Sequence, residues 1–371
     1  MNRNLYVDIN VLQTVPSANL NRDDTGAPKT ALYGGVTRSR VSSQAWKHVM
    51  RQAFADQTHN AAWANGLRTK RGPEVIAQAI LNKDETHELK DAEAMELATA
   101  IFKQAGIKLD EDKTTKQPVT GALMMLSQVQ IDQLANYALA NRDQMDKKQL
   151  KLLFNQTNAL DMALFGRMVA GDPSLSIDAA SQVAHAISTH EVTPEYDYYT
   201  AMDDLKPEDQ NGASMLNNMQ YNSATLYRYA NVNVNELKHN LDDETTVLNG
   251  LKLFLQDFIM TMPTGKQNSY ANKTLPQYVM ITLRQDTPVN LVSAFEEPVR
   301  SEDGFVQPSI KKLEREYQKS QKFVDAPLAT LILTTENSKL DQAFQQANLK
   351  TLLDNTMQAV KRALDNENTH D

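Results

Sequence analysis

Two stretches of alternating apolar and polar residues, far apart in the chain, enclose a long helical segment. Residues 5–11 alternate, with Leu5, Val7, Ile9 and Val11 on one side, which predicts a β-strand with one buried face. Residues 227–234 alternate in the same way and predict a second strand. Between them, residues 73–171 consist mainly of Ala- and Leu-rich helical patterns separated by polar turns. The chain is therefore limited to a mixed fold in which a helical insertion interrupts a strand–helix–strand unit.

The remaining patterns complete this order. Ser42 or Ser43 is expected to cap a helix whose apolar stripe is Trp46, Val49, Met50 and Ala53. Further strands are expected at residues 196–202, 278–283 and 328–335, helices at 247–262 and 340–364, a long loop at 21–35, and a polar hairpin tip or loop at 203–222. This order is that of a ferredoxin-like, RRM-type sheet. The predicted class is α+β, with a large helical insertion and a protruding β-hairpin.

Composition excludes several classes of protein. The chain has no cysteine, which excludes a disulfide framework, a zinc ribbon and a thiol nucleophile. It has no apolar run near the length of a membrane span and no signal-peptide layout at the start, so a cytoplasmic location is expected. His185 and His190 are five positions apart and would not share a helical face, which argues against a metal pair. We expect no cofactor and no resident metal.

Basic residues are concentrated near the N-terminus of a chain whose net charge is −8. Residues 22–51 contain six basic and only two acidic side chains. Gln44, Lys47, His48 and Arg51 would form one face of the predicted helix, opposite the Trp46 stripe. A solvated helix face is the alternative. However, the cationic face and a helix N-terminus after a glycine turn both favour a phosphate ligand.

Two further loops carry candidate chemistry. Residues 263–269 include Lys266 and Gln267, which suit phosphate and ribose contacts, although a plain connecting loop is equally compatible with the pattern. Asp23-Asp24 and Asp203-Asp204 are paired acids of the kind that bind Mg²⁺. Adjacent residues rarely face one point, so the sequence disfavours metal-dependent catalysis at either pair.

Several motifs together resemble the CasC family of type I-E CRISPR systems. Their order and spacing agree with the family as well as their content, up to about position 310. The motifs are Leu20-Asn21-Arg22-Asp23-Asp24, Tyr33-Gly34-Gly35, Arg40-Val41-Ser42-Ser43-Gln44, Phe165-Gly166-Arg167-Met168, Ala184-His185-Ala186-Ile187, Thr200-Ala201-Met202-Asp203-Asp204, Tyr227-Arg228-Tyr229-Ala230-Asn231, Gly265-Lys266-Gln267 and Gln307-Pro308-Ser309-Ile310.

The resemblance implies a hand-shaped subunit of an antiviral surveillance complex, Cascade, with no enzymatic activity. An RRM/ferredoxin-like palm (1–57, 191–232 and 233–371) would carry helical fingers (58–190) and a β-hairpin thumb (203–222). Copies of the subunit would form a homo-oligomer along the CRISPR guide RNA (crRNA), together with other Cascade subunits, and present the guide to target DNA. Each thumb would turn one guide base outward. No membrane partner is implied.

The resemblance also implies three sets of binding residues. The RNA backbone would be held by Arg22, Lys29, Ser42, Gln44, Lys47, Arg51, Lys266 and Gln267. The outward-turned base would meet Met168, Tyr199, Met202 and Leu216. Target DNA would meet Lys147, Lys148 and Lys151. Two alternatives stay open: a metal-dependent endoribonuclease of a related CRISPR effector, using Asp23 or Asp24, and a generic single-strand RNA-binding protein.

Overall fold

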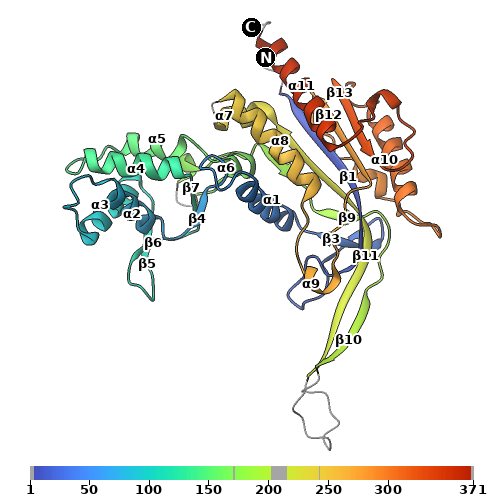
Figure 1. The fold of residues 1–371 in the computed structure, drawn as a ribbon, viewed down its shortest axis with the longest axis horizontal. Coiled ribbons are helices and arrows are strands. Elements are labelled where there is room, and N and C mark those ends of the chain that lie inside the picture. The colour runs from blue at the N-terminus through green and yellow to red at the C-terminus, as the bar shows by residue number, and fades with distance from the viewer. Residues whose placement is uncertain (1–3, 170–171, 202–214, 242, 369–371) are drawn as a thin grey trace, which may run out of the picture. The chain divides into compact units, whose positions relative to one another are not determined.

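The computed structural model describes residues 4–169, 172–201, 215–241 and 243–368 (Figure 1). By its internal contacts the chain divides into two compact units. Unit 1 consists of Met1–Met50, Val183–Asn231 and Phe254–Asp371, and unit 2 of Arg51–Gln182 and Val232–Leu253. Helices α1 (Ser43–Gln57) and α8 (Glu244–Met260) contribute residues to both units. Across the described ranges, we find no helix long and apolar enough to cross a membrane.

Unit 1 is built on an antiparallel sheet. Its main path runs in the order β13-β12-β1-β11-β9-β3-β2, and β10 pairs with β11. Segments from the start, middle and end of the chain are therefore neighbours in the sheet. The strands are β1 (Tyr6–Ala18), β2 (Thr30–Tyr33), β3 (Val36–Val41), β9 (Ala186–Ser188), β10 (Glu195–Ala201), β11 (Met215–Asn233), β12 (Tyr278–Arg284) and β13 (Ala329–Thr334).

Strand β1 is buried on both faces, so the expectation of one buried face was wrong. Leu5, Val7, Ile9 and Val11 are buried as predicted, but the polar residues between them are buried as well. The Asp8 carboxylate accepts a hydrogen bond from the Tyr229 hydroxyl at 2.7 Å, and Asn10 accepts one from Tyr227 at 2.8 Å. These partners lie on β11, so alternation in the sequence could not reveal them.

Helices cover the sheet of unit 1. Helix α10 (Val306–Ser320) and the 3-10 helix η2 (Leu291–Phe295) join a core that contains Tyr227, Tyr229 and Met280. Helix α11 (Leu349–Asn368) packs on β12 and β13. The short helix α9 (Gln267–Tyr270) and the 3-10 turn η3 (Gln342–Phe344) lie in connecting segments.

Residues 21–35 are not a single long loop. Residues 30–41 form the β2–β3 hairpin, joined at Gly34 and Gly35. Their φ values of +61° and +78° fit a two-residue turn of the type that requires left-handed backbone. A Cβ atom on Gly34 would lie 1.6 Å from the Glu296 carbonyl oxygen, so only glycine fits there.

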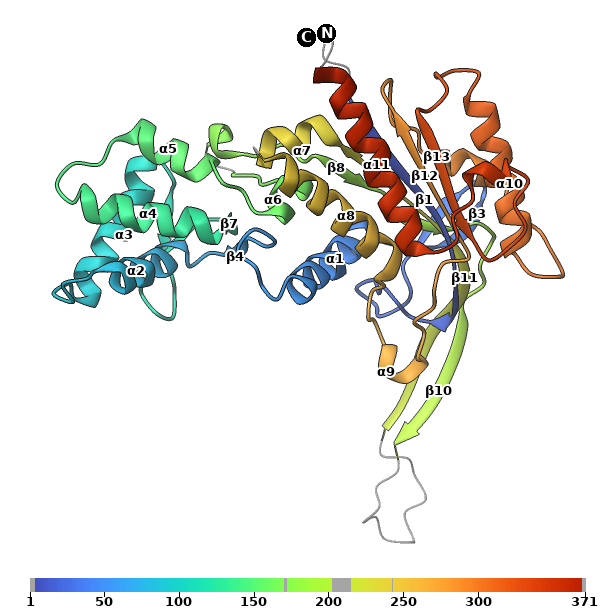
Figure 2. The same cartoon turned by 45° about the horizontal axis from the view of Figure 1, so that its top comes forward.

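Strands β10 and β11 form a hairpin that extends beyond the rest of the sheet (Figures 1 and 2). Its register pairs Glu195 with Tyr221 and Ala201 with Met215. Residues 215–222, expected in a hairpin tip or loop, instead belong to β11. Met202, Asp203 and Asp204 lie outside the described residues.

Unit 2 is mainly helical, as predicted, with a core that includes Ile76, Phe102 and Phe154. Two short antiparallel pairs, β4–β7 and β5–β6, were not predicted. Its elements are β4 (Leu67–Thr69), α2 (Gly72–Lys83), α3 (Asp91–Ala105), β5 (Leu109–Glu111), β6 (Pro118–Thr120), β7 (Met124–Leu126), α4 (Gln128–Ala140), α5 (Lys147–Asn155), α6 (Leu160–Phe165), η1 (Pro173–Leu175) and α7 (Val234–Leu241), with β8 (Ser181–Val183) at the boundary.

Candidate nucleic-acid interface

Two polar loops of unit 1 meet with their backbones in close contact. A Cβ atom on Gly265 would lie 2.2 Å from the carbonyl oxygen of Leu20, so the approach requires glycine. Gly265 and residues 20–24 line an open hollow of about 430 Å³ together with Gly26. Arg22 is exposed at this hollow. The contact therefore brings the loop that carries Lys266 and Gln267 to the loop that carries Arg22.

The first loop is also tied to the start of α1. The Ser42 backbone N–H donates to the Asn21 side-chain oxygen at 2.9 Å, and the Lys29 N–H donates to the Asn21 carbonyl at 2.8 Å. The Ser42 hydroxyl accepts from the Ala45 N–H at 3.3 Å, which confirms the predicted cap. Asn19 fixes the other end of the loop, because its side-chain amide donates to Gly26 and Gln220.

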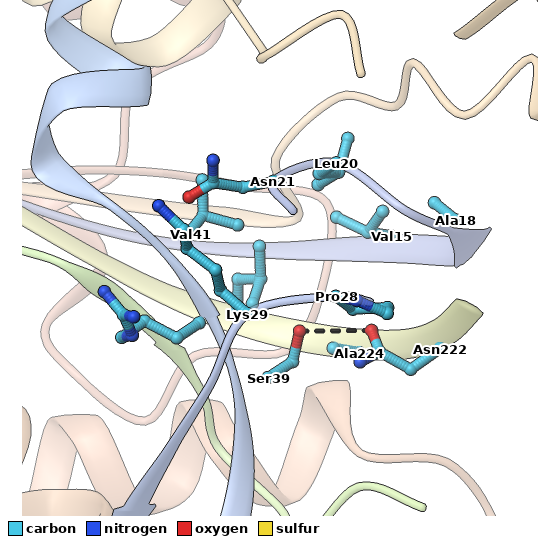
Figure 3. A pocket seen from close by; sticks show the side chains of 12 residues that line it. Val15, Ala18, Leu20, Asn21, Pro28, Lys29, Ser39, Val41, Asn222 and Ala224 are labelled. Carbon is cyan, nitrogen blue, oxygen red and sulfur yellow. Dashed lines mark hydrogen bonds between the residues drawn. The ribbon is translucent and has the colours of Figure 1, made fainter. Parts of the chain in front are cut away.

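A second, smaller pocket shares Leu20 and Asn21 with the first hollow, so the two adjoin. Figure 3 shows Lys29, Asn21, Ser39 and Asn222 around it, with a 3.1 Å hydrogen bond between Ser39 and Asn222. Arg40 lines this pocket too. Its guanidinium lies 3.1 Å from the His185 ring nitrogen Nδ1.

The surroundings of His185 are positively charged, as its pKa indicates. Its pKa is lowered, first by burial and then by the charges of Arg40 and Lys29. His185 was weighed above as a metal ligand and was not predicted to be part of this surface. The sign in the sequence that could have revealed it is that His185 belongs to the Ala184-His185-Ala186-Ile187 motif of the family resemblance. We call Arg22, Lys29, Arg40, Lys47, Lys266 and His185 the cationic surface.

Helix α1 presents the predicted polar face in its first turns. Gln44 and His48 are exposed and Lys47 is half-buried, while Trp46 is buried beneath the Arg228 guanidinium, 3.8 Å from the ring centroid. Burial lowers the pKa of Lys47. A partly desolvated ammonium gains more from a phosphate than one fully in water does.

Arg51 has a different environment from Lys47. Its Nε donates to the Asp161 carboxylate at 2.7 Å and its Nη2 to the Gly66 carbonyl at 3.1 Å, both in unit 2. Asp161 is fully buried, and burial raises its pKa although Arg51 opposes the change. The guanidinium of Arg51 therefore neutralises a buried acid.

Residues expected around an outward-turned base are spread over both units. Met168, in unit 2, is 82% exposed, and Tyr199, on β10, is 40% exposed. Leu216 lies on β11 opposite Thr200. Met202 lies outside the described residues. Exposure of this degree is unusual for a methionine and leaves Met168 open to an apolar contact.

The three lysines expected to meet DNA lie on α5. Lys147 and Lys148 are exposed. Lys151 instead pairs with Asp172 at 2.5 Å and donates to the Ser174 hydroxyl. The hydrogen bond from Lys151 is the main reason that the pKa of Asp172 falls to about 2. Lys147 and Lys148 are thus the members of this set that face solvent.

The candidate catalytic acid Asp23 shapes its own loop. One carboxylate oxygen accepts from the Thr25 N–H, the Thr25 hydroxyl and the Ala27 N–H, which lowers the pKa of Asp23. This is the geometry of an aspartate turn. Within the part of the chain that the structure describes, no group of three or more acidic or histidine side chains is placed to hold a metal ion.

Comparison with known proteins gives a family for this arrangement. Chains from two solved assemblies are similar over 95% of this chain and 99% of their own length. One is a CRISPR RNA-guided surveillance complex in a pre-nicking state (TM-score 0.82, 32% identity), and the other is a CRISPR RNA-guided surveillance complex (TM-score 0.74, 28% identity). No curated protein matches. The model of the CT1975-like protein family, a Cas family, matches residues 7–360, and the chain therefore belongs to this family.

Proposed function

We propose that this chain is the guide-RNA-binding backbone subunit of a type I-E Cascade complex, of the CasC kind. The observation that carries the proposal is the cationic surface. Arg22 and Lys29 lie on one loop, Lys266 on a second, Lys47 on α1, Arg40 on β3 and His185 just before β9. These elements adjoin through Asn21, Ser42, Gly265 and the contact of Arg40 with His185, in a chain with net charge −8. The similarity to chains of CRISPR RNA-guided surveillance complexes supports the same role.

The chemistry of the surface suits a ribose-phosphate backbone of any sequence. Lys and Arg side chains and backbone N–H groups bind phosphate oxygens and carry no sequence information. Arg22, Lys29, Lys47 and Lys266 would hold phosphates, and Gln44 and Gln267 would hydrogen-bond ribose or phosphate oxygens. Ser42 acts by fixing the start of α1. We assign Arg51 to the fold, because its guanidinium is bound to Asp161.

The sheet order supports the RRM-like part of the proposal. Within the main path, β12, β1, β11 and β9 are consecutive neighbours. Numbered along the chain, with β1 first and β12 last, these four strands stand in the order 4-1-3-2, with α1 after the first strand and α8 after the third. This is the order of a ferredoxin-like sheet. In this reading unit 1 is the palm.

The hairpin β10–β11 and the exposed Met168 support contacts with bases and with neighbouring copies. Tyr199 and Met168 each present exposed apolar surface of the kind that a base turned out of the guide would cover. Copies of the subunit would line the guide RNA, with Lys147 and Lys148 attracting target DNA. The subunit itself would bind without cutting, since Asp23 is engaged by its own loop.

A double variant tests the assignment of the cationic surface. Lys47→Ala with Lys266→Ala removes two cations from different elements, and Lys361→Ala with Arg362→Ala removes two exposed cations from α11 as a matched control. We expect the first variant, but not the control, to co-purify with far less RNA, while both show wild-type circular dichroism. Normal RNA content in the first variant would rule out the proposed surface. Sequencing of the bound RNA distinguishes a CRISPR guide from unrelated RNA, and only a guide agrees with the proposal.

Incubation with RNA and Mg²⁺ tests for the alternative activity. The purified chain is expected to leave a guide-length RNA intact. Cleavage that is abolished by Asp23→Asn or Asp24→Asn would instead support a metal-dependent endoribonuclease.

A further inference from the structure

Helix α10 carries a basic stripe along its exposed side. Lys311, Arg315 and Lys319 follow one another at intervals of four residues, and Lys322 comes two residues after the helix ends. At 3.6 residues per turn Lys311, Arg315 and Lys319 leave the helix on one side, and Lys322 follows in the turn after it. All four are exposed, while Ile310, Leu313 and Tyr317 on the opposite side are buried. We call these four residues the α10 stripe.

Cations outnumber acids at this place. Lys319 lies 3.6 Å from Glu316, but Lys311, Arg315 and Lys322 form no salt bridge with any residue in the described ranges. Lys312 pairs with Glu297 at 2.9 Å. The pKa of Glu297 is lowered mainly by Lys312, and Arg300 and Arg315 add to the effect through their charges. One exposed carboxylate therefore has three cations around it, and the stripe continues beyond it.

An exposed aromatic side chain follows the stripe directly. Phe323 is 91% exposed. The loop that carries it is held by a clamp two residues later. The Arg284 guanidinium donates to the Asp325 carbonyl at 2.6 Å, and the Asp325 N–H donates to the Asp286 carboxylate at 3.0 Å. Arg284 and Asp286 are themselves an ion pair, at 3.0 Å. The ring is thus presented on a fixed loop.

The α10 stripe and the first turns of α1 lie over opposite faces of the sheet. On β1, Asp8, Asn10 and Leu12 point to the face that α10 covers, as their contacts with Tyr227 and Tyr229 indicate. Gln13 points to the other face, where it accepts from Arg228, whose guanidinium stacks on Trp46 of α1. Because side chains alternate along a strand, a nucleic acid held on α1 would not reach the stripe through the sheet.

We propose that the α10 stripe and Phe323 bind a second strand of nucleic acid, single-stranded and distinct from the guide. Phosphates of the strand contact Lys311, Arg315 and Lys322, and a base stacks on Phe323. Proteins that bind single strands without sequence preference combine a row of cations with exposed aromatic rings in this way. A duplex would use the cations but not the ring, since its bases are already stacked.

The test measures binding of a fluorescein-labelled oligo(dT) to the full chain over a series of KCl concentrations. The background is Lys47→Ala with Lys266→Ala, so that the cationic surface contributes little. On this background we add Lys311→Glu with Arg315→Glu, or, as a control of equal charge, Lys361→Glu with Arg362→Glu on α11. Two lost phosphate contacts should flatten the slope of log affinity against log salt by about 1.4. The α11 pair should leave the slope unchanged.

The Phe323→Ser variant distinguishes binding of a single strand from binding of other polyanions. It should weaken oligo(dT) binding about tenfold and leave binding of a blunt duplex unchanged. Equal affinity after reversal of the α10 charges, or equal losses from the α10 and α11 pairs, would overturn the proposal. So would binding of an acidic polypeptide such as polyglutamate as tightly as oligo(dT).

The design keeps the two proposals apart. If the background variant alone abolishes all binding, the α10 stripe is not a site. If the background variant keeps normal RNA content while reversal of α10 removes oligo(dT) binding, the second-strand site stands and the assignment of the cationic surface fails.

Discussion

Lys47 and Arg51 lie one helical turn apart on α1, yet their side chains have different partners. Lys47 is half-buried in unit 1, on the helix whose start is tied to the loop that carries Arg22 and Lys29. Arg51 binds Asp161 and Gly66 in unit 2. The spacing in the sequence groups the two as one cationic face, but the carboxylate that binds Arg51 lies 110 positions away. Substitution of Arg51 should therefore act on stability before it acts on RNA.

Arg51→Ala is expected to destabilise the fold. It leaves the fully buried Asp161 carboxylate without its counterion, which costs about 3–5 kcal/mol for a buried pair and about 2–3 kcal/mol here, since Arg51 is 24% exposed. Urea denaturation measures the change. Lys47→Ala should change the unfolding free energy by less than about 1 kcal/mol.

A second substitution shows whether charge is the cause. Asp161→Asn removes the unpaired charge while its side-chain oxygen still accepts from the Gly66 N–H. Asp161→Asn on the Arg51→Ala background should therefore restore part of the lost stability. No recovery would mean that Arg51 stabilises unit 2 through packing rather than through its charge.

Asp8 makes stability depend on pH in the direction opposite to that of most carboxylates. Burial raises its pKa to about 7, and hydrogen bonds from Tyr229 and the Val289 N–H, with Arg284 nearby, only partly offset this effect. In the unfolded chain the pKa is about 3.9. The folded state therefore holds a proton that the unfolded state has released. The contribution of Asp8 to stability falls as pH rises from about 4 to about 7 and is constant above that.

Asp8→Asn should remove this dependence. We expect the urea midpoint of the native chain to fall more between pH 5 and pH 8 than that of the variant. An asparagine can still accept from Val289 and donate to the Tyr229 hydroxyl, so the variant should fold. Equal pH dependence of the two chains would contradict the role assigned to Asp8.

At the scale of elements, several periodic patterns were predicted correctly and some elements were missed. The patterns gave the capped start of α1 and the strands β11 and β12, because their apolar residues recur at helical or strand spacing. Helix α10 was not predicted. Its buried side combines Ile310, Leu313 and Tyr317, which do recur at helical spacing, with polar Ser309 and Glu314. The helical pattern was therefore present in the sequence and was overlooked.

The hairpin β2–β3 was missed for a different reason. Its second strand contains Thr37, Arg38, Ser39 and Arg40, which suggest a solvated loop. In the fold, Arg38 is fully buried and donates to the carbonyl groups of Tyr33, Ser188 and Phe295. Ser188 and Phe295 come from distant segments, so only the tertiary structure makes this burial favourable.

The same limit applies to the candidate site. The basic residues of the cationic surface can be listed from the sequence, and the family resemblance assigns most of them to RNA binding. The bond from Ser42 to Asn21 and the contact of Gly265 with Leu20 exist only once the loops are folded together. The sequence also gave no sign that Lys151 is engaged by Asp172.

Gly265→Ala tests whether the junction of the two loops matters apart from its charges. The added Cβ would lie 2.2 Å from a backbone oxygen, so the loops must separate. We expect a clear loss of co-purifying RNA although no charge changes.

Gly304→Ala provides the matched control. It lies in a loop of the same unit, and no atom lies within 4 Å of its added Cβ, although its φ of +93° adds backbone strain. Its RNA content should stay normal even if its melting temperature falls slightly. A Gly265→Ala chain with normal RNA content would show that the two loops act independently.

At the scale of the whole molecule, the net charge of each copy affects whether free copies associate with one another. Each copy carries −8, so free copies repel one another at low salt. If copies line a guide RNA, the mass of the complex should rise in steps with RNA length, and the chain without RNA should not form such steps. Light scattering with RNAs of graded length measures this. One fixed mass for all lengths would contradict assembly along RNA.

The burial of β1 on both faces has a consequence for how the chain is made. Asp8 receives its hydrogen bonds from residues 221 and 281 positions later, so β1 emerges from the ribosome long before its neighbours exist. At ordinary rates of translation the delay is on the order of 10 s to 1 min. During that time the backbone of β1 is an unpaired strand edge, and the apolar side chains of Val7, Ile9 and Val11 are uncovered. Such a strand is prone to mispairing. Nascent chains stalled before residue 278 should stay sensitive to protease near β1 and should recruit chaperones, whereas chains stalled beyond residue 334 should not.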